Sequence, residues 1–185
     1  MDFNCRDYNH IYFYNDVTHE SIQNMIEQIR IINEYSEGQD LINGMQLKTT
    51  PKPILLHIHS YGGSVFAGIA GMKAIEESEI PITTIVDGVA ASAATFLALA
   101  GSSRFINPHA FMLIHEISSS TSSWGKFSDI EKNYNFMKEI MKTIKNIYKK
   151  YTSIKPGELD VLLQRDIFWN ASKCSKFLSK KKSSQ

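Results

Sequence analysis

The sequence predicts an α/β fold in which the sheet is largely parallel. Short β-branched or apolar runs alternate along the chain with segments whose apolar residues recur every three or four positions. The length of 185 residues fits a single domain, residues 1–185, with its own hydrophobic core. Hydrophobic residues make up 43% of the chain and charged residues 21%, a globular composition that argues against a disordered or fibrous protein.

The N-terminal part predicts a strand and then an amphipathic helix. Residues 11–14 form a short apolar and aromatic run typical of a strand, and Thr18 can cap a helix after it. From Ser21 to Tyr35, isoleucine and methionine recur at three- and four-residue spacing, which predicts a helix with one face against the core. Residues 36–53 lose this period and contain two glycines and two prolines, so we expect an inserted, exposed loop.

Two strand–turn–helix units follow. Residues 54–59 predict a buried strand, and residues 64–77 a helix rich in small side chains. Residues 81–86 predict the next strand, followed by a small-residue turn and a short apolar helix that Gly101 would end in the left-handed conformation. Residues 104–106 and 110–115 flank an Asn-Pro turn, which predicts a hairpin-like pair of strands.

The C-terminal third predicts a long helix. Ser128 and Glu131 have the spacing of a capping box, and apolar residues then recur by threes and fours to Tyr151. A second apolar face leaves two arrangements open: the helix projects into a partner subunit, or it lies across its own sheet. Pro156 suits the first turn of a further helix, and the Lys- and Ser-rich residues 176–185 predict a solvated tail.

Charge and cysteine content exclude several classes of protein. Twenty Lys and Arg against nineteen Asp and Glu give a net charge of +1, without the basic excess of a nucleic-acid binder. The two cysteines, Cys5 and Cys174, form neither a disulfide scaffold nor a metal-binding pattern. The sequence shows no signal-peptide core and no apolar run long enough for a membrane span. We therefore expect a cytoplasmic protein with no nucleic-acid or membrane partner.

Three polar residues follow predicted strands or helices and could carry chemistry. Ser92 lies among alanines at a strand-to-helix junction, where it could be a nucleophile beside free backbone N–H groups or simply a helix cap. His115 ends a predicted strand and could be its general base or a structural histidine. Asp166 could orient an imidazole or form a surface ion pair.

Two other patterns carry less chemical information. His57 and His59 share one face of a strand and could begin a metal site, but no HExxH pattern or carboxylate cluster accompanies them, so we assign no metal ligand. Gly62 and Gly63 follow a strand without the lysine of a P-loop or a GxGxxG pattern. We expect them to allow a close backbone approach to a ligand.

Read in order, four segments resemble the motifs of the ClpP serine peptidase family. They are SYGGSV at 60–65, GVAASA at 88–93, FMLIH at 111–115 and RDIF at 165–168. The family has an SPGGS-type segment, a GxAAS nucleophile turn, an MIH strand end and an RDxF motif in this order and at comparable spacing. The resemblance covers residues 11–177.

The resemblance implies a catalytic triad. Ser92 would be the nucleophile, His115 the general base and acid, and Asp166 the orienting carboxylate. The backbone N–H groups of Gly63 and Ala93 would form the oxyanion hole. An extended peptide would pair with the main chain around the implied substrate-binding residues Gly62, Ser64, Val65 and Glu116.

The resemblance also implies an architecture and partners. The fold would be a ClpP/crotonase-like α/β unit with a protruding handle, which matches the long helix expected from Ser128. Family members form heptameric rings that stack face to face into a tetradecamer, and an AAA+ unfoldase such as ClpX or ClpA feeds unfolded chains into it. We therefore expect a homo-oligomeric endopeptidase for peptides and unfolded proteins. ATP belongs to the unfoldase, and we expect no cofactor in this chain.

Departures from the family pattern leave alternatives open. Tyr61 and Ala93 replace a usual proline and methionine, which a backbone oxyanion hole tolerates, and Glu116 replaces the glutamine after the histidine. Ten residues before Ile11 imply a short axial gate, and residues 178–181 replace an expected strand. Such divergence resembles a phage-type member, which would act in the host cytoplasm. The alternative functions are a non-catalytic, ClpR-like ring subunit and a crotonase-like acyl-CoA enzyme.

Overall fold

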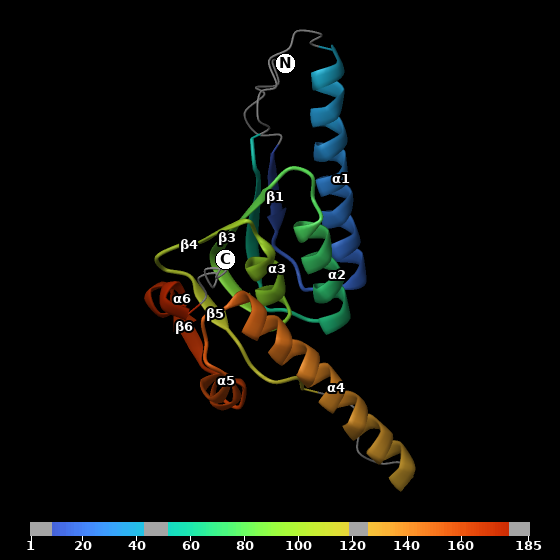
Figure 1. Cartoon of the computed structure of the whole chain (residues 1–185), viewed down its shortest axis with the longest axis vertical. Coiled ribbons are helices and arrows are strands. Elements are labelled where there is room, and N and C mark those ends of the chain that lie inside the picture. The colour runs from blue at the N-terminus through green and yellow to red at the C-terminus, as the bar shows by residue number, and fades with distance from the viewer. Residues whose placement is uncertain (1–8, 43–51, 119–125, 178–185) are drawn as a thin grey trace, which may run out of the picture.

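The computed structural model describes residues 9–42, 52–118 and 126–177, which form a mixed α/β fold (Figure 1). The fold class predicted from the sequence is confirmed. The elements in chain order are β1 (His10–Phe13), α1 (His19–Ile42), β2 (Ile54–Ser60), α2 (Val65–Glu76), β3 (Ile82–Ala91), α3 (Ala94–Ala100), β4 (Ser103–Ile106), β5 (Phe111–Leu113), α4 (Phe127–Tyr151), α5 (Pro156–Leu163), β6 (Phe168–Asn170) and α6 (Ala171–Phe177).

A single sheet runs through the described part of the chain. Its strands lie in the order β1-β2-β3-β5-β6, and β4 also pairs with β3. Every pair is parallel except β5 with β6. Because β3 is ten residues long, it pairs with β4 through residues 83–86 and with β5 through residues 89–91. The carboxyl end of β3 therefore lies beside β5.

The predicted hairpin is wrong, because β4 and β5 each pair with β3 and not with one another. The backbone N–H of Asn107 donates to the carbonyl of Val86 at 2.9 Å, so the chain stays beside β3 where it passes from β4 to β5. The Asn-Pro turn shifts the chain along β3 without reversing its direction. The result is two short parallel strands along one long strand.

The core lies between the sheet and the helices α1, α2 and α3. Helix α1 packs on β1 and α2, and α3 packs on α2 and β3 (Figure 1). Strands β1 and β2 bury alternate residues, such as Ile11 and Phe13 in β1, while the intervening Tyr12 is 57% exposed. This alternation is what a sheet with one covered face requires. No helix in the described ranges is both long and apolar enough to cross a membrane.

Helix α1 is longer than the sequence predicts. It begins after Thr18, whose hydroxyl accepts a hydrogen bond from the N–H of Ser21 at 3.1 Å, as expected for the cap. It continues to Ile42, so the first seven residues of the expected loop 36–53 are helical. Gly38 does not end the helix because one glycine costs a helix interior only about 1 kcal/mol. Residues 43–51 of that loop lie outside the described residues, as do residues 1–8 and the tail residues 178–185.

Two expected helix boundaries also differ. Gly101 has φ −54° and ψ 142°, so it does not end α3 in the left-handed conformation. Instead, the next N–H, that of Ser102, donates to the carbonyl of Ile82 and returns the chain to the sheet. Helix α4 has Lys126 at its N-cap, with no side-chain cap hydrogen bond. Ser128 thus lies within the first turn, and the predicted capping box does not form.

Helix α4 projects away from the sheet (Figure 1). Its buried residues are Ile140, Ile144 and Tyr148, which recur every four residues in its second half. The apolar residues of the first half remain exposed, among them Phe127, Ile130, Tyr134 and Phe136. The helix therefore does not lie across its own sheet, and the protruding handle expected from the family resemblance is present.

Candidate active site

Ser92 occupies a sharp turn between β3 and α3. Its φ is +53°, the only positive φ of a non-glycine residue in the part of the chain that the structure describes. Such a conformation costs about 1–3 kcal/mol, so the surrounding structure must hold it. The N–H of Ser92 donates to the carbonyl of Leu113 at 2.9 Å, and its carbonyl accepts from the N–H of Thr95 at 3.0 Å. Because Ala93 is the N-cap residue of α3, Ser92 is not the helix cap.

His115 lies two residues beyond the end of β5. Since Ala91 and Leu113 are partners in the parallel register, the turn at Ser92 and the segment leading to His115 leave the same edge of the sheet. The next N–H, that of Glu116, donates to the carbonyl of Leu163 at 2.8 Å and ties this segment to the end of α5. His115 is thereby fixed from both sides, with a side chain that is 22% exposed.

Asp166 comes to His115 through the antiparallel pairing of β5 and β6. Leu113 is the partner of Phe168, and two further residues in that register bring His115 opposite Asp166. The His115 Nδ1 atom is 3.5 Å from the Asp166 Oδ1 atom. The Asp166 side chain is 81% exposed, so solvent and salt weaken its electrostatic interaction with His115.

Gly62 and Gly63 form a second turn that packs directly against the Ser92 turn. Their φ values are +98° and +144°, a backbone conformation that residues with a side chain rarely adopt. A Cβ atom on Gly62 would lie 2.6 Å from the carbonyl oxygen of Ala91 and 2.7 Å from the Cβ of Ser92. On Gly63 it would lie 2.5 Å from the carbonyl oxygen of Val17. Only glycine permits this close approach of the two turns.

The two backbone N–H groups expected at an oxyanion hole belong to these turns. Gly63 and Val17 are partners in an isolated β-bridge, but the hydrogen bonds of this bridge are made by the neighbours of Gly63. The N–H of Val17 donates to the carbonyl of Gly62, and the N–H of Ser64 donates to the carbonyl of Val17. Among the described residues, the N–H groups of Gly63 and Ala93 donate to no other protein group. Both are thus available to a ligand oxygen.

Ser92 and His115 line one small cavity of about 60 Å³. Within the described part, no hydrogen bond joins the Ser92 hydroxyl to His115, and such bonds often tighten only when substrate binds. The other residues around the cavity come from the glycine turn, the Ser92 turn, the start of α2, α3, the segment after His115 and α4. They are Gly63, Val65, Ala93, Phe96, Glu116, Ile117, Ser118, Ile144 and Tyr148.

The cavity includes two of the four expected substrate-binding residues, Val65 and Glu116, and leaves out the other two. Gly62 is buried, and the Ser64 hydroxyl accepts a hydrogen bond from the N–H of Ala67, so it caps α2. Phe96 and Tyr148 lie in helices and were not expected at this site. Nothing in helical periodicity distinguishes a core residue from one that also lines a cavity.

An open groove adjoins the cavity and continues along α4. It measures about 510 Å³ and shares Glu116 and Ile117 with the cavity. Its remaining wall is formed by one side of α4, with Tyr134, Met137, Lys138, Met141, Lys142, Lys145, Asn146 and Lys149. An extended chain could therefore run from the groove past Ser92.

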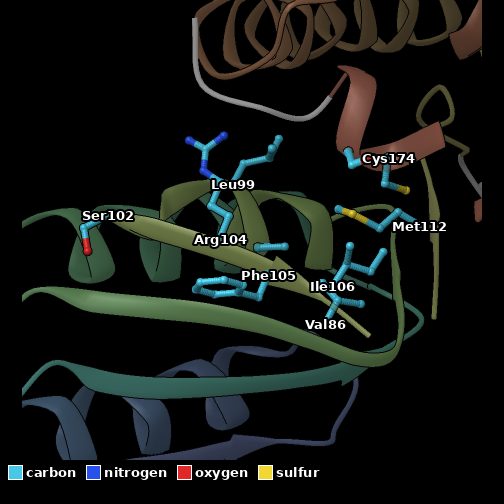
Figure 2. A pocket seen from close by; sticks show the side chains of 10 residues that line it. Val86, Leu99, Ser102, Arg104, Phe105, Ile106, Met112 and Cys174 are labelled. Atoms are coloured by element: carbon cyan, nitrogen blue, oxygen red, sulfur yellow. The ribbon is translucent and has the colours of Figure 1, made fainter. Parts of the chain in front are cut away.

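A separate cavity of about 370 Å³ lies between α3, β4 and α6 (Figure 2). Ser102 lies toward one end of it, and Met112 and Cys174 lie together toward the other (Figure 2). Burial raises the pKa of the Cys174 thiol to about 11, so this sulfur is protonated at neutral pH and a poor nucleophile. Burial likewise lowers the pKa of Arg104 to about 10, which still leaves it charged. The described residues of this lining include no nucleophile with an adjacent base.

The two histidines considered for metal binding lie on the exposed face of β2. His57 contacts His10 through Nε2 at 3.1 Å and Asp87 through Nδ1 at 2.9 Å. The Tyr14 hydroxyl also donates to Asp87, and this hydrogen bond raises the pKa of Tyr14 to about 12. In the ranges that the structure describes, no three His, Cys, Asp or Glu side chains are grouped so as to hold a metal ion.

Comparison with known proteins gives a family match over most of the chain. The Clp protease family model matches residues 6–177. The chain is 30% identical over 182 residues to the ATP-dependent Clp protease proteolytic subunit 1 of Chlamydia muridarum (strain MoPn / Nigg), covering 96% of this chain and 86% of that protein. It is 33% identical over 138 residues to the protein of the same name from Chlamydia pneumoniae, covering 72% and 71%. The chain therefore belongs to the Clp protease family.

Proposed function

We propose that this chain is a Clp-type serine endopeptidase with Ser92, His115 and Asp166 as its catalytic triad. One observation carries the proposal: Ser92, held at positive φ, lines the same cavity as His115, whose Nδ1 atom lies 3.5 Å from Asp166. A serine on a strained strand-to-helix turn is a known way to expose a nucleophile. The relatives named as proteolytic subunits support the same reaction.

The triad would act by acyl transfer. His115 takes the Ser92 proton while Oγ bonds to the carbonyl carbon of the peptide. The tetrahedral intermediate then collapses, the C–N bond breaks, and His115 gives the proton to the leaving amine. Water, deprotonated by His115, hydrolyses the acyl-enzyme and returns Ser92 to its starting form. Asp166 stabilises the charged imidazole throughout and itself stays ionised.

The N–H groups of Gly63 and Ala93 would stabilise the negative oxygen of the tetrahedral intermediate. They belong to two turns in direct contact, and neither has another acceptor among the described residues. One such donor is worth about 2.7–4 kcal/mol in related chemistry. This role needs backbone atoms only, so it tolerates Ala93 in place of the family's usual methionine.

The cavity and groove suggest how substrate binds. Apolar side chains, Val65, Phe96, Ile117 and Ile144, form part of the cavity wall beside polar groups, and the cavity volume is about 60 Å³. A short apolar side chain beside the cleaved bond fits that space. Peptide on either side would extend along the backbone near Gly62 and Ser64 and past Glu116 into the groove beside α4, which explains how unfolded chains of varied sequence could be accepted.

The working form would be a homo-oligomer, with heptameric rings stacked into a tetradecamer, and residues 1–185 would act as one peptidase domain. The exposed apolar side chains in the first half of α4, including Phe127 at 80% exposure, support self-association through this helix. An AAA+ unfoldase such as ClpX or ClpA would supply unfolded chains and hydrolyse ATP. The chain itself would need no cofactor and would act in the cytoplasm.

Peptide hydrolysis by Ser92→Ala tests the triad. Purified wild type and variant are compared on a fluorogenic peptide, with the oligomer mass measured in parallel. We expect Ser92→Ala and His115→Ala to lose hydrolysis and to keep the wild-type oligomer mass. Ser175→Ala is the matched control, because this exposed serine lies on α6 and, among the described residues, its hydroxyl bonds only the carbonyl of Ser172. Unchanged hydrolysis by Ser92→Ala would refute the proposed function.

A further inference from the structure

A pair of buried hydroxyl groups connects α4 to the Ser92 turn. The Thr95 Oγ1 atom lies 2.6 Å from the carbonyl oxygen of Ser92 and 2.7 Å from the hydroxyl oxygen of Tyr148. Thr95 has 0% and Tyr148 1% of its surface exposed, so water does not compete for these bonds. Tyr148 is also the last of the three buried residues of α4.

The directions of these two hydrogen bonds follow from counting protons. A carbonyl oxygen only accepts, so at 2.6 Å the Thr95 hydroxyl proton must point to Ser92. That proton is then used, and the bond to Tyr148 requires the tyrosine O–H to donate to Thr95 Oγ1. Burial raises the pKa of Tyr148 above its ordinary value, so it keeps its proton at neutral pH. The chain of donation runs from Tyr148 to Thr95 to Ser92.

The Ser92 carbonyl is the acceptor that fixes the orientation of the next peptide plane. That plane contains the N–H of Ala93, the group we place in the oxyanion hole. Thr95 holds the carbonyl twice, through its backbone N–H at 3.0 Å and its hydroxyl at 2.6 Å. Since the peptide unit is rigid, holding the carbonyl oxygen also holds the direction of that N–H.

We propose that Thr95 and Tyr148 are positioning residues, whose hydroxyl relay sets the strained Ser92 turn and the Ala93 N–H in their catalytic orientation. The inference rests on the proposed function and adds to it. Hydrogen bonds in such a buried chain strengthen one another, so loss of either hydroxyl weakens the hold on Ser92. Neither side chain reacts. Tyr148 reaches the cavity but acts here through Thr95.

The test compares Thr95→Val with Thr95→Ser. Valine keeps the shape and removes the donor, whereas serine restores the hydroxyl. The readouts are the second-order rate of Ser92 labelling by a fluorophosphonate, and kcat and KM on a fluorogenic peptide. We expect Thr95→Val to slow labelling and lower kcat by about fivefold or more with KM little changed. Thr95→Ser should stay within about threefold of wild type, and Tyr148→Phe should fall between them.

Thr84→Val is the matched control. Thr84 lies on β3 and is 1% exposed, and its hydroxyl donates at 2.8 Å to the carbonyl of Ala98 in α3, the helix that also carries Thr95. This variant loses an equivalent buried hydrogen bond at the far end of α3, so it should lower thermal stability and leave the labelling rate within twofold of wild type. Thermal unfolding is recorded for every variant to separate stability from reactivity.

The labelling rates of these variants decide whether the inference about Thr95 and Tyr148 holds. Equal labelling of wild type and Thr95→Val overturns the inference, as does equal slowing by Thr84→Val or failure of serine to restore the rate. Tyr148→Phe at the wild-type rate overturns the part of the inference that concerns α4. A wild-type protein whose Ser92 is not labelled at all overturns the proposed function itself, and the inference with it.

Discussion

Replacing Gly62 with alanine should damage both stability and Ser92 reactivity. The added Cβ would lie 2.6 Å from the Ala91 carbonyl oxygen and 2.7 Å from the Ser92 Cβ. Neither atom belongs to the far end of a flexible side chain, so the Gly62 turn or the Ser92 turn must move. Alanine at φ +98° adds strain of about 1–3 kcal/mol, and overpacking adds about 1–3 kcal/mol. Together they predict a loss of about 2–6 kcal/mol in the free energy of unfolding.

The assay is urea unfolding at one fixed protein concentration, combined with the fluorophosphonate labelling rate under native conditions. We expect a lower unfolding midpoint and at least tenfold slower labelling, because the Ala93 nitrogen is 3.1 Å from the new Cβ and shifts with the turn. Gly157→Ala makes the same chemical change in α5, where an added Cβ meets nothing within 4 Å. It should leave labelling unchanged and raise stability by about 0.5 kcal/mol. A Gly62→Ala protein with wild-type midpoint and labelling rate would refute the reasoning.

Three further predictions concern other parts of the molecule. Asp166→Asn should lower kcat by about 10–100-fold with KM unchanged. This loss of kcat is smaller than the loss expected for a buried triad carboxylate, because the Asp166 side chain is 81% exposed. An unchanged kcat would exclude a catalytic role for Asp166. In a Cys5→Ser background, Cys174 should resist iodoacetamide in the native protein at pH 7.5, because its raised pKa keeps the thiol protonated, and should react once urea unfolds the chain. Fast labelling of the native protein would contradict the burial of Cys174. In the dissociated subunit, Ile144→Ala should cost about 2–5 kcal/mol in unfolding free energy and Ile130→Ala under about 0.5 kcal/mol, and equal costs there would contradict the exposure of the first half of α4 in the single chain.

Local patterns predicted those elements whose periodicity or end signals are strong. Thr18 caps α1, Pro156 opens α5, and the β2 strand begins at Ile54 as expected. These features depend on neighbouring residues, so the sequence contains the information directly. The misassigned β4–β5 hairpin depends on β3, whose length lets two strands share one partner. Which strand a short segment pairs with is decided by long-range packing that no turn signal reports.

The candidate site also combines features that neighbouring residues determine with features that only long-range packing determines. Ser92 and His115 follow strands whose ends a local sequence pattern can locate. That pattern alone does not distinguish a catalytic role from a structural one for either residue. Asp166 comes to His115 through β6, a three-residue strand too short for any periodicity. The relation between Thr95 and Tyr148 spans 53 positions and joins two helices, so only the tertiary structure brings it out. The resemblance of the four motifs, taken in order, to those of the ClpP family implied the triad where single residues did not.

Intact-mass analysis of fluorophosphonate labelling tests the central claim most directly. The Ser92 Oγ would bond to phosphorus, fluoride would leave, and His115 would take the serine proton. We predict one adduct per chain on the assembled wild-type oligomer, mapped to the peptide that contains Ser92, and no adduct on Ser92→Ala or His115→Ala. An adduct that persists in Ser92→Ala would place the reactive nucleophile at another residue and contradict the role of Ser92. An assembled wild-type protein that takes up no label would contradict an activated serine and favour a non-catalytic ring subunit.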